Sequence, residues 1–318
     1  MNLCEVIKPG LFTTVQDLGR YGYQSYGVPV SGAMDNYAFI VANLLVGNKP
    51  NDACLEATLL GPELEFLNEA QLAITGAVLT PTINKIKAKC WMTFQVRKGD
   101  VLSFGNFKSG LRAYLAVRGG IEAPVVLGSR STYARGGFGG FQGRPLRAGD
   151  VIKAYKPETF LRSGLSMPHH LIPIYGIKST IEVVLGPQSD YFTETGLGTF
   201  FSSMYSVTSE SDRMGYRLDG PMVEQKRSFD MVSDAVPVGA VQVPANGKPI
   251  VVMQDGQTTG GYPKVGIVIT PDVSRLGQVR PNHKIKFSEI SASEARVKLL
   301  KHIQGISQIK DKLEESKL

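Results

Sequence analysis

Turn-forming residues interrupt this chain along its whole length and leave room mainly for short strands. Of its 318 residues, 35 are glycine and 18 are proline, against a usual glycine share of roughly 7%. The segments between them are short, apolar and rich in β-branched and aromatic residues, which is typical of strands. The clearest are residues 63–66, 71–75, 111–117, 181–185 and 250–254. Because strands do not alternate regularly with helices, the pattern excludes doubly wound and TIM-barrel folds. It predicts a mainly β protein with few short helices.

Two segments carry helix signals. Residues 35–46 show a helical period, with Asp35 as a suitable N-cap and Gly47 at the C′ position. A second helix is expected from Ser291, which forms a capping box with Glu294. The charged end of the chain, residues 311–318, is expected to fray.

The chain is long enough for two domains, each with its own core. Residues 156–179 contain Pro157, Pro168 and the adjacent His169 and His170, without a clear period, so we interpret this segment as a connection. The two sides of it share a loose order of parts, since DLGRYG near the start resembles DRMGYR in the second half. The sequence therefore predicts two related β-barrel domains, residues 1–155 and 180–318, the second with a helical C-terminal tail.

Several classes of protein are disfavoured by composition. The N-terminus lacks the features of a signal peptide, and no apolar stretch approaches the roughly 20 residues of a membrane span. The three cysteines, Cys4, Cys54 and Cys90, have no CxxC spacing, which fits reduced thiols in a cytosol. The net charge of +7 is dispersed, and no DNA- or RNA-binding motif appears. We expect a cytoplasmic protein that binds neither nucleic acid nor membrane and has no metal centre of its own.

The first concentration of reactive side chains lies near the N-terminus. It comprises Arg20, Tyr21, Ser31 and Asp35, just before the first expected helix. Exposed N–H groups at the start of a helix, with an arginine nearby, suit a carboxylate or a phosphate. The alternative is a glycine-rich connection in which Asp35 merely caps the helix.

A second candidate is the adjacent pair Asp212 and Arg213. As a functional pair, Arg213 holds an anion while Asp212 orients it or accepts a proton. The alternative is a turn ion pair, worth under about 1 kcal/mol when exposed.

The third and most suggestive candidate follows the strand expected at residues 250–254. Backbone N–H groups of such a polar, glycine-rich loop can form an anion site, with a lysine as a point charge. The candidate side chains are Asp255, Gln257, Thr258, Thr259, Tyr262 and Lys264. An ordinary hairpin loop is the alternative, and the P-loop pattern GxxxxGK[ST] is absent.

These segments carry a resemblance to a known family. GLFTTVQDLGRYGYQSYGVPVSGAMD, LEATLLGPELEF, GPQSDYF, SDRMGYRLDGP and QDGQTTGGYPKVG look like successive signature blocks of the KipA/PxpC family, also described as the allophanate-hydrolase-subunit-2 or biotin-dependent carboxyltransferase domain. The matches are collinear over residues 10–287.

The resemblance implies two cyclophilin-like β-barrel domains. It also implies a 5-oxoprolinase subunit that works with a KipI/PxpB-type subunit and a PxpA subunit of the LamB/YcsF type. The reaction is then the ATP-dependent opening of 5-oxo-L-proline to L-glutamate, with Mg²⁺ expected alongside ATP.

Roles for the candidate residues follow as hypotheses from that reaction. Arg20, Arg213 and Lys264 supply cations for phosphates and the substrate carboxylate, and Gln257 and Thr259 supply hydrogen-bond donors. Three carboxylates bind Mg²⁺ or orient the substrate in this hypothesis: Asp35, Asp212 and Asp255. The remaining contacts with ATP and substrate come from Tyr21, Ser31, Thr258 and Tyr262.

Two other functions remain open at this point. The family includes regulatory proteins that antagonise a KipI-type inhibitor of a histidine kinase, so the chain can act mainly as a binding partner. It can also be a carboxyltransferase-like enzyme acting on a urea-like amide.

Overall fold

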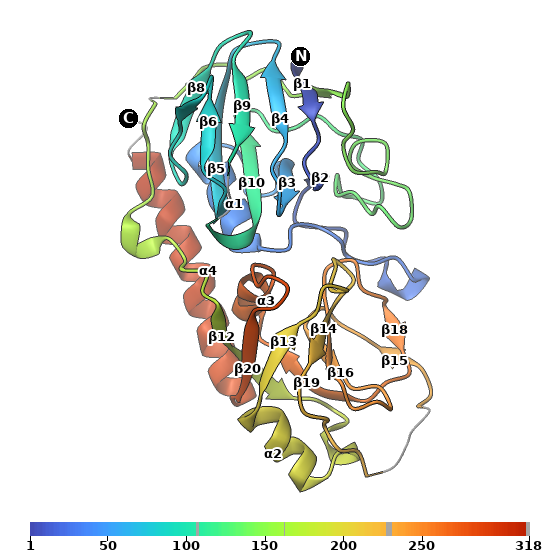
Figure 1. The fold of residues 1–318 in the computed structure, drawn as a ribbon. Helices are drawn as coiled ribbons and strands as arrows, with labels where there is room; N and C mark the ends of the chain where they lie inside the picture. The colour runs from blue at the N-terminus through green and yellow to red at the C-terminus, as the bar shows by residue number, and fades with distance from the viewer. Residues whose placement is uncertain (106–107, 162, 227–230, 316–318) are drawn as a thin grey trace. The chain divides into compact units, whose positions relative to one another are not determined.

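The computed structural model describes residues 1–105, 108–161, 163–226 and 231–315. These form two compact units. The first contains Met1–Arg20, Ser31–Tyr175 and the chain from Gly305 onwards, and the second contains Tyr21–Val30 and Gly176–Gln304. The mainly β class is confirmed (Figure 1).

The first unit is built from two antiparallel sheets. One has the order β11 (Val151–Lys153), β1 (Asn2–Lys8), β4 (Glu63–Phe66), β9 (Val101–Phe104), β6 (Pro81–Ile83) and β7 (Ile86–Lys87). The other has the order β2 (Phe12–Gln16), β3 (Cys54–Thr58), β10 (Ser109–Val117), β5 (Ala70–Val78) and β8 (Thr93–Val96). The strands of this unit are therefore divided between two sheets instead of the single barrel expected, and its cyclophilin-like character stays a prediction.

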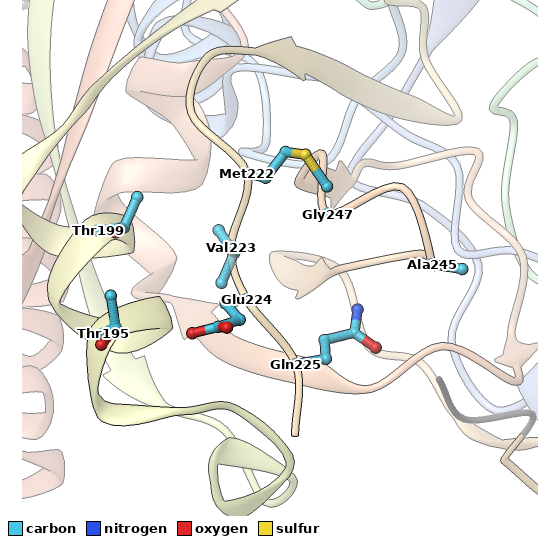
Figure 2. A pocket seen from close by; sticks show the side chains of 8 residues that line it. All are labelled: Thr195, Thr199, Met222, Val223, Glu224, Gln225, Ala245 and Gly247. Atoms are coloured by element: carbon cyan, nitrogen blue, oxygen red, sulfur yellow. The ribbon is translucent and has the colours of Figure 1, made fainter. Parts of the chain in front are cut away.

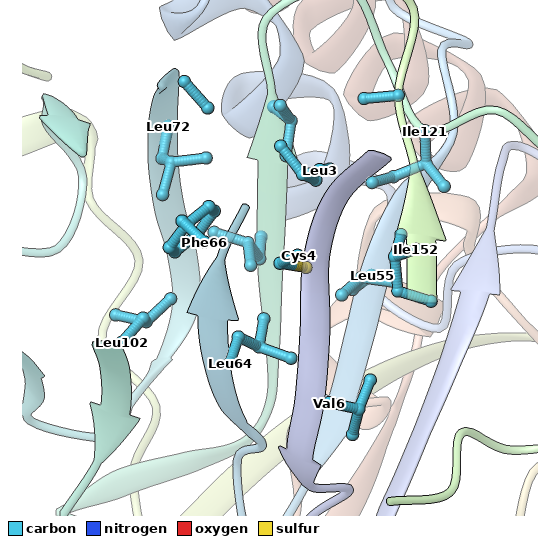
Figure 3. Close-up of a cluster of buried hydrophobic side chains, with 14 of the residues drawn as sticks. Leu3, Cys4, Val6, Leu55, Leu64, Phe66, Leu72, Leu102, Ile121 and Ile152 are labelled. Atoms are coloured by element: carbon cyan, nitrogen blue, oxygen red, sulfur yellow. The ribbon is translucent and has the colours of Figure 1, made fainter. Parts of the chain in front are cut away.

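One cluster of buried apolar side chains joins these two sheets. Leu3 and Val6 of β1 and Leu64 of β4 meet Leu55 of β3 and Leu72 of β5, all nearly inaccessible to solvent. Figure 3 shows these side chains together with Cys4, which is part of the same cluster. Burial raises the pKa of the Cys4 thiol to about 12, so Cys4 acts as a small apolar residue.

Helix α1 (Asn36–Leu45) packs on β5 and β10 of the first unit. Asp35 caps it by accepting a hydrogen bond from the Ala38 N–H at 3.0 Å, and Gly47 follows it with a φ of 73°. Both end signals were predicted. Phe39 and Leu44 are buried as well as Ala38, Val41, Ala42 and Leu45, so the helix is covered on most of its sides.

The second unit is a closed barrel of seven strands. Their order is β12 (Lys178–Leu185), β19 (Lys264–Val268), β16 (Ala240–Gln242), β17 (Ile250–Val252), β14 (Gly215–Asp219), β13 (Met204–Val207) and β20 (Lys284–Glu289). The parallel pairing of β12 with β20 closes the barrel, and Ile181 and Val183 of β12 point into its core. The barrel predicted for the second half is confirmed.

Smaller elements complete the second unit. A two-stranded ladder joins β15 (Asp234–Ala235) to β18 (Thr259–Gly260). The helices are α2 (Glu194–Ser202), α3 (Thr270–Leu276) and the N-terminal part of α4 (Ala292–Glu315), with the 3₁₀ turns η1 (Gln24–Tyr26) and η3 (Ser189–Tyr191); η2 (His169–Leu171) lies in the first unit. Among the described residues, none of the helices combines the length and apolar character needed to span a bilayer.

Two expectations about the end of the chain are wrong. Helix α4 has 24 residues, so not all helices are short. The chain does not fray from Asp311, because α4 continues to Glu315 and buries Ile309 and Leu313; residues 316–318 lie outside the described part. These two side chains pack into the α1 cluster of the first unit, and residues 21–30 group with the second unit. The end of α4 and residues 21–30 therefore belong to other units than the predicted domain limits assign them to.

Candidate functional site

The strongest candidate site lies in the second unit around Lys264, the first residue of β19. Its ammonium group donates to Asp234 Oδ2 at 2.6 Å and to the carbonyl oxygen of Ala235 at 3.0 Å. The side chain of Lys264 is 3% exposed, whereas that of Asp234 is 49% exposed. The hydrogen bond from Lys264 is the main reason why the pKa of Asp234 lies below its usual range. A buried ammonium group is thus neutralised by a carboxylate that is open to water.

Three glutamine residues lie near this ion pair, and one of them, Gln188, contacts both of its members. Gln188 accepts from the Lys264 backbone N–H and donates to Asp234 Oδ2, each at 3.3 Å. Gln242 pairs with Lys264 in the β16–β19 ladder, and its amide donates to the Tyr262 carbonyl at 3.4 Å.

Gly260 brings the third glutamine into this group. A Cβ on Gly260 would lie 2.7 Å from Gln257 Nε2 and 2.8 Å from Gln242 Nε2, so glycine leaves room for both amides to approach the backbone here. Gly260 itself pairs with Asp234 in the β15–β18 ladder. We refer to Gln188, Asp234, Gln242, Gln257 and Lys264 as the lysine–glutamine cluster.

The chemistry of the lysine–glutamine cluster suits a small molecule that has both a carboxylate and an amide. An ammonium group attracts a carboxylate. Each primary amide offers two N–H donors and one carbonyl acceptor, the complement of a second amide. Gln257 is exposed and therefore accessible to a ligand.

The loop residues predicted with Lys264 lie around this cluster. Thr259 belongs to β18 and is exposed, and Tyr262 is 44% exposed. Thr258 is partly buried and its backbone carbonyl accepts from the Val236 N–H at 2.9 Å. The segment is paired to β15, and so it is more ordered than a simple hairpin loop. The ligand contacts of these three residues stay predictions.

Arg213 and Asp255 form a second, closed charge pair in the same unit. Arg213 Nε lies 2.8 Å from Asp255 Oδ2, and Nη2 lies 3.1 Å from Oδ1. Both residues are only 6% exposed. Asp212, the neighbour considered as a partner of Arg213, instead accepts from the Met214 and Gly215 N–H groups of its own turn. The anion-binding roles of these residues stay predictions.

The N-terminal candidates have structural partners. The Arg20 guanidinium stacks on Phe138 with 4.9 Å to the ring centroid and donates to the Ser131 carbonyl. Asp35 caps α1 and also accepts from the Tyr175 hydroxyl at 2.8 Å. These contacts lie in the first unit.

The other two N-terminal candidates differ in exposure. The Ser31 hydroxyl is buried, with no hydrogen-bond partner among the described residues. Tyr21 is 67% exposed and groups with the second unit.

Sequence reasoning missed Asp234, Gln188 and Gln242. Gln188 stands inside the GPQSDYF block, so that block pointed to the correct segment without identifying the residue. Asp234 lies 30 positions before Lys264 and has no local motif. Its pairing with Lys264 could be found only from the structure, in which β15 pairs with β18.

The described residues do not provide a Mg²⁺ site of their own. They contain no group of three His, Cys, Asp or Glu side chains that could hold a metal ion. Of the three carboxylates proposed for Mg²⁺, Asp35 and Asp212 accept backbone N–H groups and Asp255 is occupied by Arg213. These residues therefore do not fit a metal held by the protein alone.

A separate pocket of about 490 Å³ lies elsewhere in the second unit (Figure 2). It is lined by α2, an extended segment and a turn, through Thr195, Thr199, Met222, Val223, Glu224, Gln225, Ala245 and Gly247. Its one charged group is Glu224, which accepts from the Thr193 hydroxyl at 2.6 Å. An anionic ligand therefore suits the lysine–glutamine cluster better than this pocket.

Comparison with known proteins gives consistent matches. The model of the family "Carboxyltransferase domain, subdomain A and B" matches residues 26–289. A protein of Haemophilus influenzae that is named as a 5-oxoprolinase subunit is 37% identical over 284 residues, which cover 89% of each chain. The Escherichia coli protein of the same name is 36% identical, over 92% of this chain and 93% of that protein.

A solved structure resembles the fold over almost the whole chain. The crystal structure of the K. lactis urea amidolyase matches with a TM-score of 0.91 and 34% identity. The match covers 97% of this chain but only 20% of that protein, so the chain corresponds to one part of a much larger enzyme.

Proposed function

Because the chain belongs to the carboxyltransferase domain family, subdomains A and B, we propose that it is a subunit of an ATP-dependent 5-oxoprolinase. The complex converts 5-oxo-L-proline to L-glutamate in the cytoplasm. Two relatives named as 5-oxoprolinase subunits support this proposal, because the similarity extends over nearly their whole length. The partners proposed are a KipI/PxpB-type subunit and a PxpA subunit of the LamB/YcsF type.

The lysine–glutamine cluster is the observation that carries the proposal. 5-Oxoproline is a five-membered cyclic amide with one carboxylate, and the cluster combines one buried ammonium group with three primary amides. In this arrangement Lys264 binds the carboxylate. Gln242 and Gln257 face the ring amide, and a donor directed at its oxygen stabilises negative charge that develops there.

The reaction needs ATP because a cyclic amide is stable and its nitrogen is a poor leaving group. Transfer of the γ-phosphoryl group to the lactam oxygen makes that oxygen a good leaving group. Water then adds to the carbon and the C–N bond breaks with the nitrogen leaving as the amine, which gives γ-glutamyl phosphate. A second water hydrolyses this acyl phosphate to glutamate and phosphate. Mg²⁺ bound with ATP would screen the phosphate charges. Because the three carboxylates proposed for Mg²⁺ do not fit a metal site, we assign no step to it here.

A reconstituted complex with both partner subunits tests the proposal through ATP hydrolysis that depends on 5-oxoproline. Replacing Lys264→Met removes a charge-assisted contact, and we expect kcat/KM to fall by about 100-fold. Lys248→Met is the matched control, because Lys248 pairs with the exposed Asp219 elsewhere on the barrel, and it should leave the rate unchanged. A Lys264→Met complex as active as the parent would contradict the proposed site.

Carboxyl transfer to a urea-like amide is a second candidate, favoured by the TM-score of 0.91 with urea amidolyase. Urea also carries amide groups that glutamine side chains can recognise, but it lacks a carboxylate for Lys264. A purely regulatory role predicts binding to a KipI-type subunit without 5-oxoproline-dependent ATP hydrolysis. The same reconstituted complex separates these outcomes, since only the 5-oxoprolinase consumes ATP when 5-oxoproline is added.

A further inference from the structure

Lys264 is an unusual buried cation because its counterion lies at the surface. Its side chain is 3% exposed and that of Asp234 is 49% exposed. A buried ammonium group without an anion is strongly destabilising, so this position favours a carboxylate. An exposed side chain, however, can move into water at little cost in desolvation.

The position of Asp234 Oδ2 is a small site for one carboxylate oxygen. It receives one hydrogen bond from Lys264 Nζ at 2.6 Å and one from Gln188 Nε2 at 3.3 Å. Gln188 is itself tied to the Lys264 backbone N–H. Gln188 therefore has a contact at the site that does not involve Asp234.

Asp234 is less firmly held than these donors. It lies on β15, a strand of two residues that, among the described residues, pairs with the two-residue strand β18. Its Oδ1 accepts from the neighbouring Ala235 N–H at 2.7 Å, which is a local contact that rotation of the side chain can break and restore.

We infer that Lys264 and Gln188 form a carboxylate-binding subsite at which Asp234 is the resident anion, exchanged for the carboxylate of the ligand. Only the identity of the ligand, a small cyclic amide with a carboxylate, rests on the proposed function. Exchange keeps Lys264 neutralised in both states, and it places the rest of the ligand beside Gln242 and Gln257. Asp234 thereby sets the affinity of the site, because every ligand must displace it.

Titration of the full-length chain followed by NMR tests this inference through the side-chain amide signals of Gln188 and Gln257. The probes are 5-oxo-L-proline, acetate, and pyrrolidin-2-one, which has the ring but no carboxylate. Asp234→Asn removes the competing anion, and we expect it to tighten binding of both carboxylates roughly tenfold. Lys264→Met should abolish carboxylate binding, Lys264→Arg should retain it, and pyrrolidin-2-one should respond to none of these changes.

Asp219→Asn serves as the matched control, because Asp219 pairs with Lys248 outside the site, and it should leave every affinity unchanged. If carboxylates bind the parent protein but bind Asp234→Asn no more tightly, the inferred exchange with Asp234 is wrong. The proposed function is not affected by that result. If acetate binds Asp234→Asn more tightly than the parent while 5-oxoproline binds neither, the exchange is supported and the proposed substrate is contradicted. If no carboxylate perturbs the two amides in any folded variant, the subsite does not exist.

Discussion

At the scale of single residues, the barrel unit contains two kinds of buried cation. Arg213 and Asp255 are both nearly inaccessible and bind each other through two hydrogen bonds, so each satisfies the charge of the other. Lys264 depends on a carboxylate that water can reach. A closed pair of this kind fixes a structure, whereas an open pair is available for exchange with a ligand. This difference favours Lys264 over Arg213 as the group that binds substrate.

Breaking the closed pair should destabilise the barrel unit. We expect Arg213→Ala or Asp255→Ala to lower the free energy of unfolding by about 3 to 5 kcal/mol, since each removes one member of a buried ion pair. The double variant should lose less than the sum of the two single losses. Urea unfolding followed by far-UV circular dichroism measures this, because the single tryptophan, Trp91, lies in the first unit.

The exposed pair of Asp219 and Lys248 is the control, and Asp219→Ala should have little effect. Additive losses in the Arg213 and Asp255 double variant would show that the two side chains do not act as a pair.

The sequence identified residues in this region better than it identified their partners. Arg213, Asp255 and Lys264 were all predicted as functional candidates. The partner of Arg213 lies 42 positions away, however, and the adjacent Asp212 caps its own turn. Charge pairs across a barrel depend on strand register, which single residues and local motifs do not encode.

At the scale of secondary-structure elements, local signals were reliable where the side chain acts on its own backbone. Asp35 starts α1 as predicted, and Ser291 forms the expected capping box with Glu294. Strand β4 has the predicted limits. The two-residue strands β15 and β18 had no recognisable pattern, because their pairing is produced by contacts between distant segments.

The capping box predicts how α4 responds to acid. Hydrogen bonds from the backbone and the hydroxyl of Ser291 hold the pKa of Glu294 below its usual range. A carboxyl whose pKa is lower in the folded state stabilises that state above its unfolded pKa of about 4.3, and the contribution is lost as the pH falls through the folded pKa. We therefore expect the first turn of α4 to loosen below about pH 4.3. The ¹³Cα chemical shifts of Ser293 and Ala295 report this change.

Glu294→Gln provides the matched control, because glutamine can accept the same hydrogen bonds without titrating. Its first turn should keep constant shifts over that range. If the parent and Glu294→Gln lose helical shifts in parallel on acidification, the carboxylate of Glu294 is not the cause.

At the scale of the whole molecule, the order of the chain does not match the order of its units. The last part of α4 returns to the first unit, where Ile309 and Leu313 enter the cluster formed by α1. Residues 21–30 group with the second unit although both flanking segments belong to the first. The sequence predicted two domains joined by residues 156–179, whereas the chain up to Tyr175 groups with the first unit. It could not predict these returns, because the local sequence of a helix or loop does not determine which unit it packs against.

The return of α4 gives the last prediction. Ile309 and Leu313 are at most 5% exposed, whereas Val297 and Leu300 on the same helix are 50% and 55% exposed. Ile309→Ala or Leu313→Ala should therefore lower the stability of the first unit by about 2 to 5 kcal/mol through the cavity that each leaves. The matched controls Val297→Ala and Leu300→Ala should change it by less than about 1 kcal/mol.

Trp91 belongs to the same cluster as Ile309 and Leu313, so its fluorescence during urea unfolding follows the unfolding of the first unit. An unfolding midpoint of Trp91 that is insensitive to Ile309→Ala and Leu313→Ala would mean that the end of the chain does not belong to the core of the first unit.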